Sequence, residues 1–516
     1  MKLIHLNIAL CIFLIFSACS PKAIQSSTDT PQPTDTQETT ITPKPTQTPL
    51  PKSQLTYTLS ISKSQEKSIH VKLIANNLRN NHFILTFWTN AANWYEWIDL
   101  KENVSNLVVM SGNGQLLQSK WGDDGISWTG NHAVIIDTQN NSSLVIEYDV
   151  KLGFIDKNFT GSGKQYLGGY LTSNYGVAEP EFIFLAPNDI EKIEYEMKVI
   201  FDLPEGWKSA AYWTKIGENE YIVDPKVNNG DSSNIEFANG AIAFGDLYKE
   251  EVTIGNTFFT AAILGYSKSD AERMASLAKK NFEYYTTIIG PTPTKGFIIV
   301  FIPAKIEGNY VNPYNENIGG FFTRIYATNI WHTPDQWWRN ISHPMFHNWT
   351  AYIDCDFWCG EGFTSYYELK ALTFIGMNSE EEVNREMANR YLQYKNEILG
   401  SSDDISIQQA SNIYETNHFY PYDFIVYSKG SLFSFLLDKE INRITNGNKS
   451  LDDVLRLIFQ QKKHLDSEQL IEDTREVTGE DFTKIVNDYL MNNNPLPFYV
   501  KGRNIFVDIP SINKSE

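Results

Sequence analysis

The sequence predicts an α+β protein of several domains: an N-terminal antiparallel β domain, a smaller α+β domain and a helical C-terminal domain. Its length of 516 residues exceeds that of one ordinary domain. Short alternating apolar stretches, broken by Asn, Gly and Asp, fill residues 55–250, whereas helical spacing dominates after Thr333. With 42% hydrophobic and 20% charged residues, the composition is that of a globular chain, which excludes wholesale disorder and a collagen-like fibre.

The first 19 residues are typical of an export signal. Lys2 supplies a positive charge, and Leu6–Phe16 form an apolar run too short for a comfortable transmembrane helix. The run ends in Phe16-Ser17-Ala18-Cys19, which resembles the bacterial lipobox, so we expect Cys19 to be lipidated and to become the mature N-terminus. The alternative is a signal peptide cut nearby, with Cys19 incidental. The lipobox implies an anchor on the extracytoplasmic face of a bacterial cell membrane.

Residues 20–54 are predicted to be a tether. Ser, Thr and Pro dominate this segment, and almost nothing in it can be buried. Such a composition cannot offset the entropy lost on ordering, so the chain is expected to be extended. Between a lipidated cysteine and a folded domain, it would hold the globular part away from the membrane.

Residues 55–250 are predicted to form an antiparallel β sandwich or saddle. The strands are short and closely spaced, as in His70–Ile74, Leu144–Tyr148 and Tyr195–Ile200. Apolar and polar residues alternate along them, which is the pattern of strands with one buried face.

Residues 251–377 are predicted to form the α+β domain, and residues 378–516 the helical one. Ser267–Thr287 has a Ser cap and helical spacing, Gly296–Ile302 is a buried strand, and a second strand runs through Ile318–Thr323. The helices expected further on are Glu380–Glu397, Tyr422–Ile444, Leu451–Gln461, Glu468–Val477 and Glu480–Met491.

A possible metal site follows a strong helix start at Thr333-Pro334. His343 and His347 are four residues apart on this helix, so both imidazoles lie on one face and can reach one zinc ion. Zinc needs a third protein ligand, and Glu361, at the start of the next predicted helix, would supply it. The sequence therefore predicts about one zinc per chain. Taken alone, a histidine pair at this spacing is more often structural.

These motifs resemble those of the gluzincin metallopeptidases, the clan of alanyl and glycyl aminopeptidases. The resemblance rests on His343-x-x-x-His347-x-Trp349 and on the run Gly360-Glu361-Gly362-Phe363-Thr364-x-Tyr366-Tyr367-Glu368. It implies a thermolysin-like fold for residues 251–377, with His343, His347 and Glu361 as zinc ligands. Tyr427-Ser428-Lys429-Gly430 matches the clan's Tyr-x-Lys-Gly, whose tyrosine stabilises the oxyanion; Tyr427 could instead be a core residue. We expect Lys429 to face solvent.

Two positions depart from the pattern of the clan. Pro344 stands where these enzymes carry the glutamate that acts as general base, and proline has no proton acceptor. Near Gly319 and Gly320 the clan carries a glutamate that binds a substrate's amino group, and this chain has Phe322 at the matching place. Glu316 could substitute for that glutamate, or it could be a solvated loop carboxylate.

Three further residues near the motifs have open roles. Glu368 lies two helical turns after Glu361, where it could bond the free nitrogen of a ligand histidine or be a surface charge. Cys355 and Cys359 could form a disulfide that fixes the approach of Glu361. They could also be two thiols or additional metal ligands.

The function predicted from these features is zinc and peptide binding by a membrane-anchored, catalytically impaired peptidase fold. Its partners would be a peptide or protein ligand and the membrane. A net charge of −19 makes nucleic acid an unsuitable partner. The alternatives are an active zinc peptidase with a non-standard base and, because 13% of residues are aromatic, a surface carbohydrate-binding protein.

Overall fold

In the computed structural model of the chain, the described residues lie between 51 and 497, so the predicted signal, Cys19 and most of the tether fall outside them. The residues not described within that range are 62–67, 89–99, 124–132, 153, 156–165, 168, 191–192, 224–239, 293, 304, 307–308, 311–314, 319–321, 328–333, 351–352, 415–416, 418 and 462. Residues 154–155, 166–167 and the described residues within 305–337 are described by their backbone alone. Within the described part, no helix combines the length and apolar character needed to span a bilayer.

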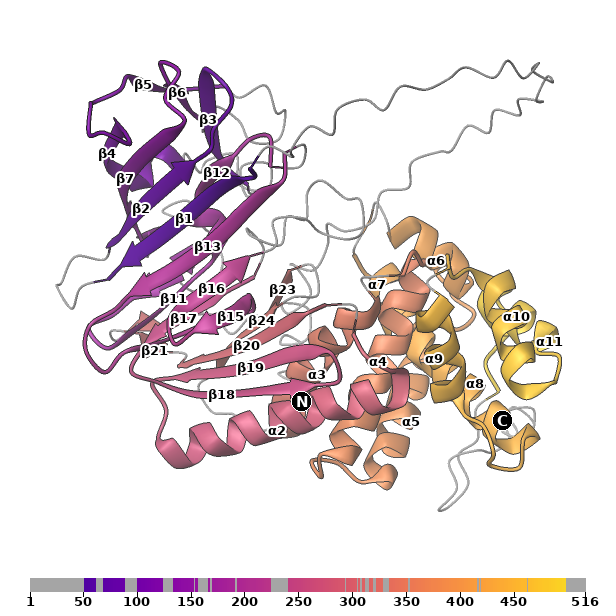
Figure 1. Cartoon of the computed structure of the whole chain (residues 1–516). Coiled ribbons are helices and arrows are strands. Elements are labelled where there is room, and N and C mark those ends of the chain that lie inside the picture. Colours follow the sequence, from indigo (N-terminus) through magenta and orange to yellow (C-terminus); the bar gives the residue numbers. More distant parts are fainter. Residues whose placement is uncertain are drawn as a thin grey trace, which may run out of the picture.

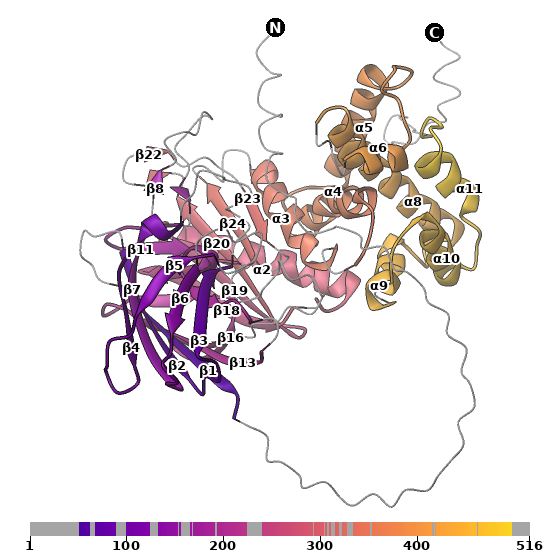
Figure 2. The same cartoon turned by 90° about the horizontal axis from the view of Figure 1, so that it is seen from above.

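The fold has the predicted order of an N-terminal β domain, an α+β domain and a helical C-terminal region (Figure 1). In Figure 2 the β domain and the helical region lie at opposite ends, with the sheet of the α+β domain between them. This confirms the predicted fold class.

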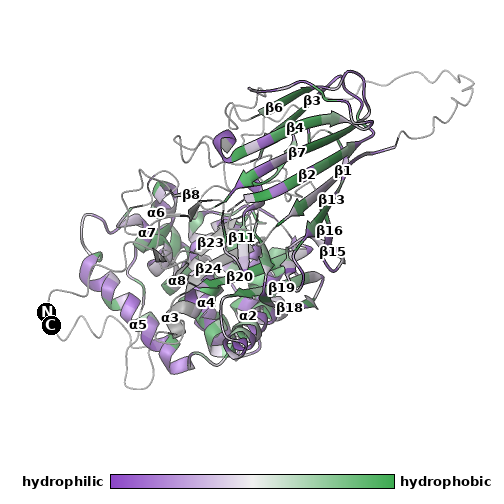
Figure 3. Ribbon diagram, turned by 90° about the vertical axis from the view of Figure 1, so that its left-hand side faces the viewer, coloured by the Kyte–Doolittle hydropathy of each residue, from purple (hydrophilic) through white to green (hydrophobic). Residues whose placement is uncertain are grey.

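Buried and more exposed side chains alternate along the strands of the β domain. Along β2 (Ser68–Asn76) and β7 (Ser143–Lys151) every second side chain is buried, and Figure 3 shows the matching alternation of hydropathy. These strands belong to a seven-stranded sheet in the order β15-β16-β13-β1-β2-β7-β4. Its other strands are β1 (Ser53–Ser60), β4 (Val104–Ser111), β13 (Tyr195–Asp202), β15 (Thr214–Gly217) and β16 (Glu220–Val223).

Two four-stranded sheets accompany the large one. The first, β10-β11-β17-β14, consists of Gly169–Leu171, Tyr175–Ala178, Ile242–Gly245 and Lys208–Ala210; the second, β12-β3-β6-β5, of Leu185–Pro187, His82–Phe87, Ala133–Asp137 and Ser119–Gly122. Buried tyrosines join the large sheet to the segment around β12, because the Tyr57 and Tyr148 hydroxyls donate to the carbonyls of Leu185 and Ile183. Short elements complete the domain: β8 (Phe154–Ile155), β9 (Tyr166–Leu167), η1 (Leu100–Asn103) and η2 (Pro180–Phe182).

Two details of the β domain differ from the sequence prediction. β1 begins at Ser53, so the last two residues of the predicted tether belong to a strand. β1 also pairs with β13 in parallel, in register from Ser53 with Tyr195 to Ser60 with Asp202, although its other neighbour β2 is antiparallel. A parallel pair needs a long crossover, and the chain between these two strands forms β2, β4 and β7 of the large sheet and all four strands of the second small sheet.

The α+β domain is a five-stranded sheet in the order β18-β19-β20-β24-β23, flanked by α2 (Lys268–Ile289) (Figure 1). Its strands are β18 (Leu247–Ile254), β19 (Thr257–Leu264), β20 (Gly296–Pro303), β23 (Asn315–Ile318) and β24 (Phe322–Ala327). The two-stranded β21 (Lys305–Ile306) and β22 (Asn309–Tyr310) lie between β20 and β23 in the sequence. Ser267 caps α2, as expected, by accepting a hydrogen bond from the Asp270 backbone N–H.

The sequence prediction placed two features of this sheet wrongly. The domain boundary predicted at residue 250 falls inside β18. This strand pairs with β19 from Leu247 to Ile254 and therefore belongs to the five-stranded sheet of the α+β domain. The single strand predicted at 318–323 is the place where β23 ends and the antiparallel β24 begins, with Ile318 opposite Phe322.

Helices dominate the described residues from Pro334 onward, and they share one apolar core with one face of the five-stranded sheet. Their bounds are α3 (Pro334–Thr350), α4 (Phe357–Phe374), α5 (Glu380–Glu397), α6 (Ile407–Tyr414), α7 (Tyr422–Phe424), the π-helical turn η3 (Ile425–Lys429), α8 (Gly430–Ile444), α9 (Leu451–Gln461), α10 (Ser467–Thr478), α11 (Thr483–Val486) and η4 (Asn487–Met491). The sequence analysis missed α6, a helix of 8 residues.

Two glycines let α4 and α8 cross with their backbones in contact. A Cβ placed on Gly362 would lie 3.0 Å from the carbonyl carbon of Gly430, and one on Gly430 would lie 3.0 Å from the Cα of Gly362. No other residue type fits at this crossing without moving a helix. The crossing brings the start of α4 beside the π-helical turn before α8.

Candidate metal centre

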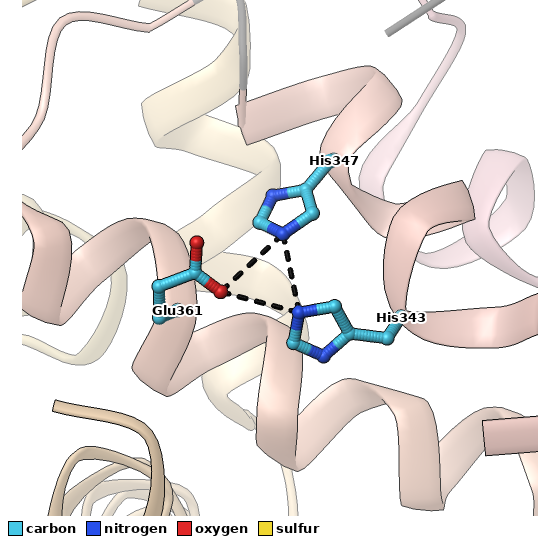
Figure 4. A group of neighbouring side chains, drawn as sticks. All are labelled: His343, His347 and Glu361. Atoms are coloured by element: carbon cyan, nitrogen blue, oxygen red, sulfur yellow. Dashed lines mark hydrogen bonds and ion pairs between the residues drawn. The ribbon is translucent and has the colours of Figure 1, made fainter. Parts of the chain in front are cut away.

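The predicted metal ligands meet in the structure. His343 and His347 project from one face of α3, and Glu361 projects toward them from the first turns of α4 (Figure 4). The Nε2 atom of His343 is 3.1 Å from Glu361 Oε2 and 3.2 Å from His347 Nε2. His347 Nε2 is 3.4 Å from the same Glu361 oxygen. The side chains are 13%, 11% and 3% exposed, in the order His343, His347 and Glu361.

These separations fit the spacing of ligands around a tetrahedral zinc ion. Two ligand atoms that are each about 2.1 Å from zinc lie about 3.4 Å apart. Two imidazole nitrogens and one carboxylate oxygen are also a donor set that zinc uses, and three protein ligands leave one position open. Within the described residues, this trio is the group of His, Cys, Asp or Glu side chains whose ligand atoms converge in this way. The residues present therefore fit zinc.

The outer nitrogens of both histidines are held by neighbouring side chains. His343 Nδ1 lies 2.9 Å from Glu368 Oε2, and because a carboxylate only accepts, this nitrogen carries the proton. That tautomer leaves the lone pair on Nε2, where a metal ligand needs it. His347 Nδ1 lies 2.9 Å from the Thr350 hydroxyl. The structure thus supports the interpretation of Glu368 as the carboxylate that orients a ligand histidine, since its side chain is 9% exposed.

In the absence of a metal ion, the same contacts determine the protonation states of the clustered side chains. Burial opposes the charged imidazole, but the hydrogen bonds to Glu361 and Glu368 prevail and raise the pKa of His343 to about 9. Burial likewise disfavours a charged Glu361, yet the two histidines hold its pKa well below the usual value. The pKa of Glu368 is lowered despite burial, by His343 and by the Arg390 guanidinium. A divalent cation would replace the Nε2 proton of the His343 imidazolium as the positive charge in this cluster, and the Nδ1 proton would stay.

Tyr427 faces the same cluster from η3. Its ring stacks on His343, with centroids 5.9 Å apart and an interplanar angle of 17°. Burial, together with the charge of Glu361, raises the pKa of Tyr427 well above its ordinary value, so the hydroxyl keeps its proton and remains a donor. A π-helical turn inserts one extra residue into a helix and often occurs at functional sites. Here it places Tyr427 opposite Glu361.

Two segments of the chain match known protein families. Residues 332–489 match the family described as peptidase family M1 domain. The chain carries a gluzincin metallopeptidase domain. Residues 56–227 match the family described as peptidase M61 N-terminal domain. The family resemblance read from the motifs is therefore confirmed, and an M1 peptidase domain implies a zinc cofactor.

Among solved structures, an aminopeptidase N family protein from Idiomarina loihiensis matches with a TM-score of 0.59 at 14% identity, over 86% of this chain and 76% of that one. At this identity the match shows the fold. Lower TM-scores are found for leukotriene A4 hydrolase from Saccharomyces cerevisiae (0.43, 17% identity, 86% and 68% covered). An M1 zinc metallopeptidase from Deinococcus radiodurans gives 0.42 at 13% identity, with 88% and 94% covered. No curated protein matches the chain.

Pro344 occupies the residue after the first ligand of this gluzincin site. It is buried in α3, and the helix continues past it to Thr350. The pyrrolidine ring offers no proton acceptor beside the ligand histidines. Glu368 does not replace the missing carboxylate, since its two oxygens bind His343 Nδ1 and Arg390 Nη2. The described carboxylates of the gluzincin motif are thus committed to the metal ligands and their support.

The amino-terminal subsite inferred from the resemblance is largely outside the described residues. Gly319 and Gly320 belong to this undescribed part of the chain. Phe322 is the first residue of β24, and Glu316 lies on β23 opposite Arg324. The role of Phe322 in substrate binding stays a prediction.

The disulfide alternative for the two cysteines is not found in the structure. Cys355 and Cys359 are both thiols. Cys355 precedes α4 and forms a β-bridge with Leu465, whereas Cys359 lies within the first turn of α4 and is fully buried in the helical core. Cys359 belongs to the apolar core of the helical region, and the half-buried Cys355 packs against the same core without a bond between the two sulfurs. Neither belongs to the metal cluster.

The expectation that Lys429 faces solvent is wrong. Its side chain is fully buried, and Nζ donates to Asn493 Oδ1 at 2.7 Å and to the Ile405 carbonyl at 3.0 Å. Burial lowers its pKa to about 8, although Asp404 opposes that shift. The lysine thus holds the π-helical turn against the segment before α6 and the C-terminal end of the helical region.

Sequence reasoning missed Arg390, Ser431 and Tyr414, which support the site. Arg390 binds Glu368, Ser431 binds Arg390, and Tyr414 packs edge-on against Tyr427 with centroids 6.1 Å apart. The i,i+4 pair of Glu386 and Arg390 could be read from helical spacing, but nothing in the sequence gives its partners on other helices.

Proposed function

We propose that the chain is a membrane-anchored, extracytoplasmic lipoprotein whose M1 domain binds one zinc ion and a peptide or protein ligand, and whose peptidase activity is strongly impaired. The observation that carries the proposal is Pro344 beside a complete set of ligands. His343, His347 and Glu361 converge at zinc spacing, while the position of the general base holds a residue without a proton acceptor.

The proposed ligand binding rests on the groups around the candidate metal centre. A zinc ion held here would act as a Lewis acid toward a carbonyl or carboxylate oxygen. Tyr427, protonated and facing Glu361, supplies a hydroxyl donor at the same place. These two features are sufficient to bind and orient a peptide carbonyl without cleaving the bond.

The proposed loss of peptidase activity rests on the chemistry of proton transfer. Hydrolysis needs a positioned group to take a proton from the attacking water, and loss of such a base typically costs about 10² to 10⁴ in rate. Pro344 cannot accept a proton, and Glu368 is bound on both oxygens. Binding therefore survives the substitution better than turnover does.

The proposed membrane anchor rests on the sequence alone. The Phe16-Ser17-Ala18-Cys19 run and the Ser/Thr/Pro-rich residues 20–54 precede the first described strand. Together they would place the M1 domain outside the cell, at a distance from the membrane that a tether of this length permits. Wild-type protein should partition into a detergent phase, and Cys19→Ser should abolish this. A water-soluble wild type with another N-terminal residue would exclude the lipoprotein.

The catalytic proposal is tested with Pro344→Glu and its control Pro344→Ala. Both variants restore a backbone N–H to α3, and a proline inside a helix costs roughly 3 kcal/mol, so both should unfold at higher temperature than the wild type. Only Pro344→Glu also supplies a carboxylate beside the metal. Hydrolysis of unblocked and internal peptide bonds by zinc-loaded protein should rise by about a hundredfold or more in this variant alone.

The outcomes separate the two catalytic hypotheses. If the wild type binds about one zinc per chain and hardly cleaves a broad peptide library, while Pro344→Glu cleaves, the proposal stands. Robust turnover by the wild type that Pro344→Glu leaves unchanged or lowers would show an active peptidase with another base. Protein that contains no zinc and does not bind added zinc would show that the three residues no longer form a metal site.

A further inference from the structure

One guanidinium touches both halves of the candidate site. Arg390 lies on α5, and its side chain is 14% exposed. Its Nη2 donates to Glu368 Oε1 at 3.1 Å, and its Nη1 donates to Ser431 Oγ at 2.8 Å and to the Ser365 carbonyl at 3.1 Å. Its Nε donates to Glu386 Oε1 at 3.4 Å. The three nitrogens of Arg390 therefore contact α4, α8 and its own helix.

The first branch leads to the metal ligands. Glu368 uses one oxygen for Arg390 and the other for His343 Nδ1, at 2.9 Å. Because the carboxylate is bound on both sides, its plane is fixed, and with it the ring of His343 and the direction of Nε2. Glu368 is buried, so without a cation beside it the carboxylate would lose a partner that it cannot replace with bulk water.

The second branch leads to Tyr427. The Ser431 hydroxyl that accepts from Arg390 itself donates to the Ser428 carbonyl at 2.8 Å. Ser428 follows Tyr427 in η3. In this π-helical turn the backbone carbonyls accept hydrogen bonds from residues at a different spacing than in an α-helix. This bond fixes the turn that aims the Tyr427 side chain at the cluster.

We propose that Arg390 is the positioning residue that keeps His343 and Tyr427 in register with each other, through Glu368 and through Ser431. The inference rests on the zinc binding proposed above and names the residue on which that binding depends. Arginine suits the task because its planar fork sends donors in two directions at once, whereas a lysine ammonium would serve one branch at a time. Glu386 and Arg339, paired at 2.8 Å, extend the same chain of alternating charges to α3.

The experiment compares Arg390→Met, Arg390→Lys and the matched control Arg385→Met. Arg385 lies on the same helix, is 66% exposed and pairs with Glu382 within its own helix, so it shares none of these contacts. Zinc affinity is measured by competition with a chelator, and cobalt(II) absorption reports the ligand geometry. Circular dichroism and the unfolding midpoint of the metal-free protein separate these effects from loss of fold. We expect Arg390→Met to bind zinc about 10- to 100-fold more weakly, with an altered cobalt spectrum, and Arg385→Met to match the wild type.

The two branches have separate readouts. In metal-free protein with isotope-labelled histidine, the proton on His343 Nδ1 should be resolved in the wild type and in Arg385→Met, and should broaden or disappear in Arg390→Met. At saturating zinc, a hydroxamate probe should bind Arg390→Met severalfold more weakly, because the Tyr427 donor is misplaced. Arg390→Lys should fold and give intermediate values for both.

Two results would overturn the inference. One is a folded Arg390→Met protein with the zinc affinity, cobalt spectrum and Nδ1 proton of the wild type. The other, which decides the matter if Arg390→Met does not fold, is an Arg390→Lys protein equal to the wild type in every readout. A wild type that binds no zinc would refute the proposed function alone, since the Nδ1 proton of the metal-free protein still tests the contact from Arg390 through Glu368 to His343.

Discussion

The crossing of α4 and α8 makes a quantitative prediction for Gly362→Ala. The new Cβ would lie 3.0 Å from the carbonyl carbon of Gly430, 3.1 Å from its Cα and 3.2 Å from its oxygen. All three atoms are backbone, so no side chain can rotate away, and the helices must move apart by a few tenths of an ångström to reach ordinary contact. Overpacking of this kind costs about 1–3 kcal/mol.

Helix propensity acts in the opposite direction and provides a control. Alanine is favoured over glycine inside a helix by about 1 kcal/mol, so Gly362→Ala should lower the free energy of unfolding by a net of about 0–2 kcal/mol. Gly360 lies two residues earlier on α4, and a Cβ built there meets nothing within 4 Å. Gly360→Ala should therefore be neutral or stabilising by up to about 1 kcal/mol. The two variants should differ by roughly 1–3 kcal/mol.

The assay is urea unfolding of metal-free protein, followed by zinc titration of the folded variants. Because Glu361 lies between the two glycines and Tyr427 lies three residues before Gly430, separation of the helices should also weaken zinc binding in Gly362→Ala alone. Equal stabilities of Gly362→Ala and Gly360→Ala would refute the close backbone contact. Equal zinc affinities, with the stability difference present, would show that the crossing supports the fold but not the site.

Further predictions concern the metal ligands, pH and the buried lysine. His347→Ala and Glu361→Ala should each weaken zinc binding at least about tenfold in a chelator competition, since each removes a ligand; wild-type affinity in either would remove that residue from the site. With chelator present, His343 contributes stability that is fully present below its ordinary pKa of 6.5 and is lost as pH rises through about 9. The unfolding midpoint should fall over that interval, and His343→Gln should lack this component of the pH dependence; an unchanged profile would contradict it. Lys429→Met leaves Asp404 without its buried cation and should destabilise the fold by about 3 kcal/mol in urea unfolding, unlike the more exposed Lys439→Met; equal effects would contradict the buried role.

Local spacing determined much of what the sequence could give. The i,i+4 separation of His343 and His347 places both rings on one helix face wherever the helix packs, and the Ser267 cap and buried Gly296–Ile302 strand follow from neighbouring residues in the same way. Glu361 is predicted as the third ligand only from its place at the start of the next helix, and the role of Tyr427 rests on the family resemblance, because each lies on a different helix from the histidines. The role of Glu368 stayed open for the same reason, as two turns on one face describe a surface charge equally well.

Tertiary structure alone decided which distant groups meet. Lys429 was expected in solvent and is buried because Asp404 and Asn493 approach it from segments 25 and 64 residues away. The strand predicted at 318–323 is two strands, with Ile318 of β23 opposite Phe322 of β24; Gly319-Gly320 is a turn signal that the prediction of a single strand overlooked. Arg390 joins α4, α8 and its own helix through one guanidinium, an arrangement that helical periodicity cannot report. Periodicity fixes which face of an element is apolar, but the partner across that face is selected by packing of the whole chain, and the candidate metal centre lies between such partners.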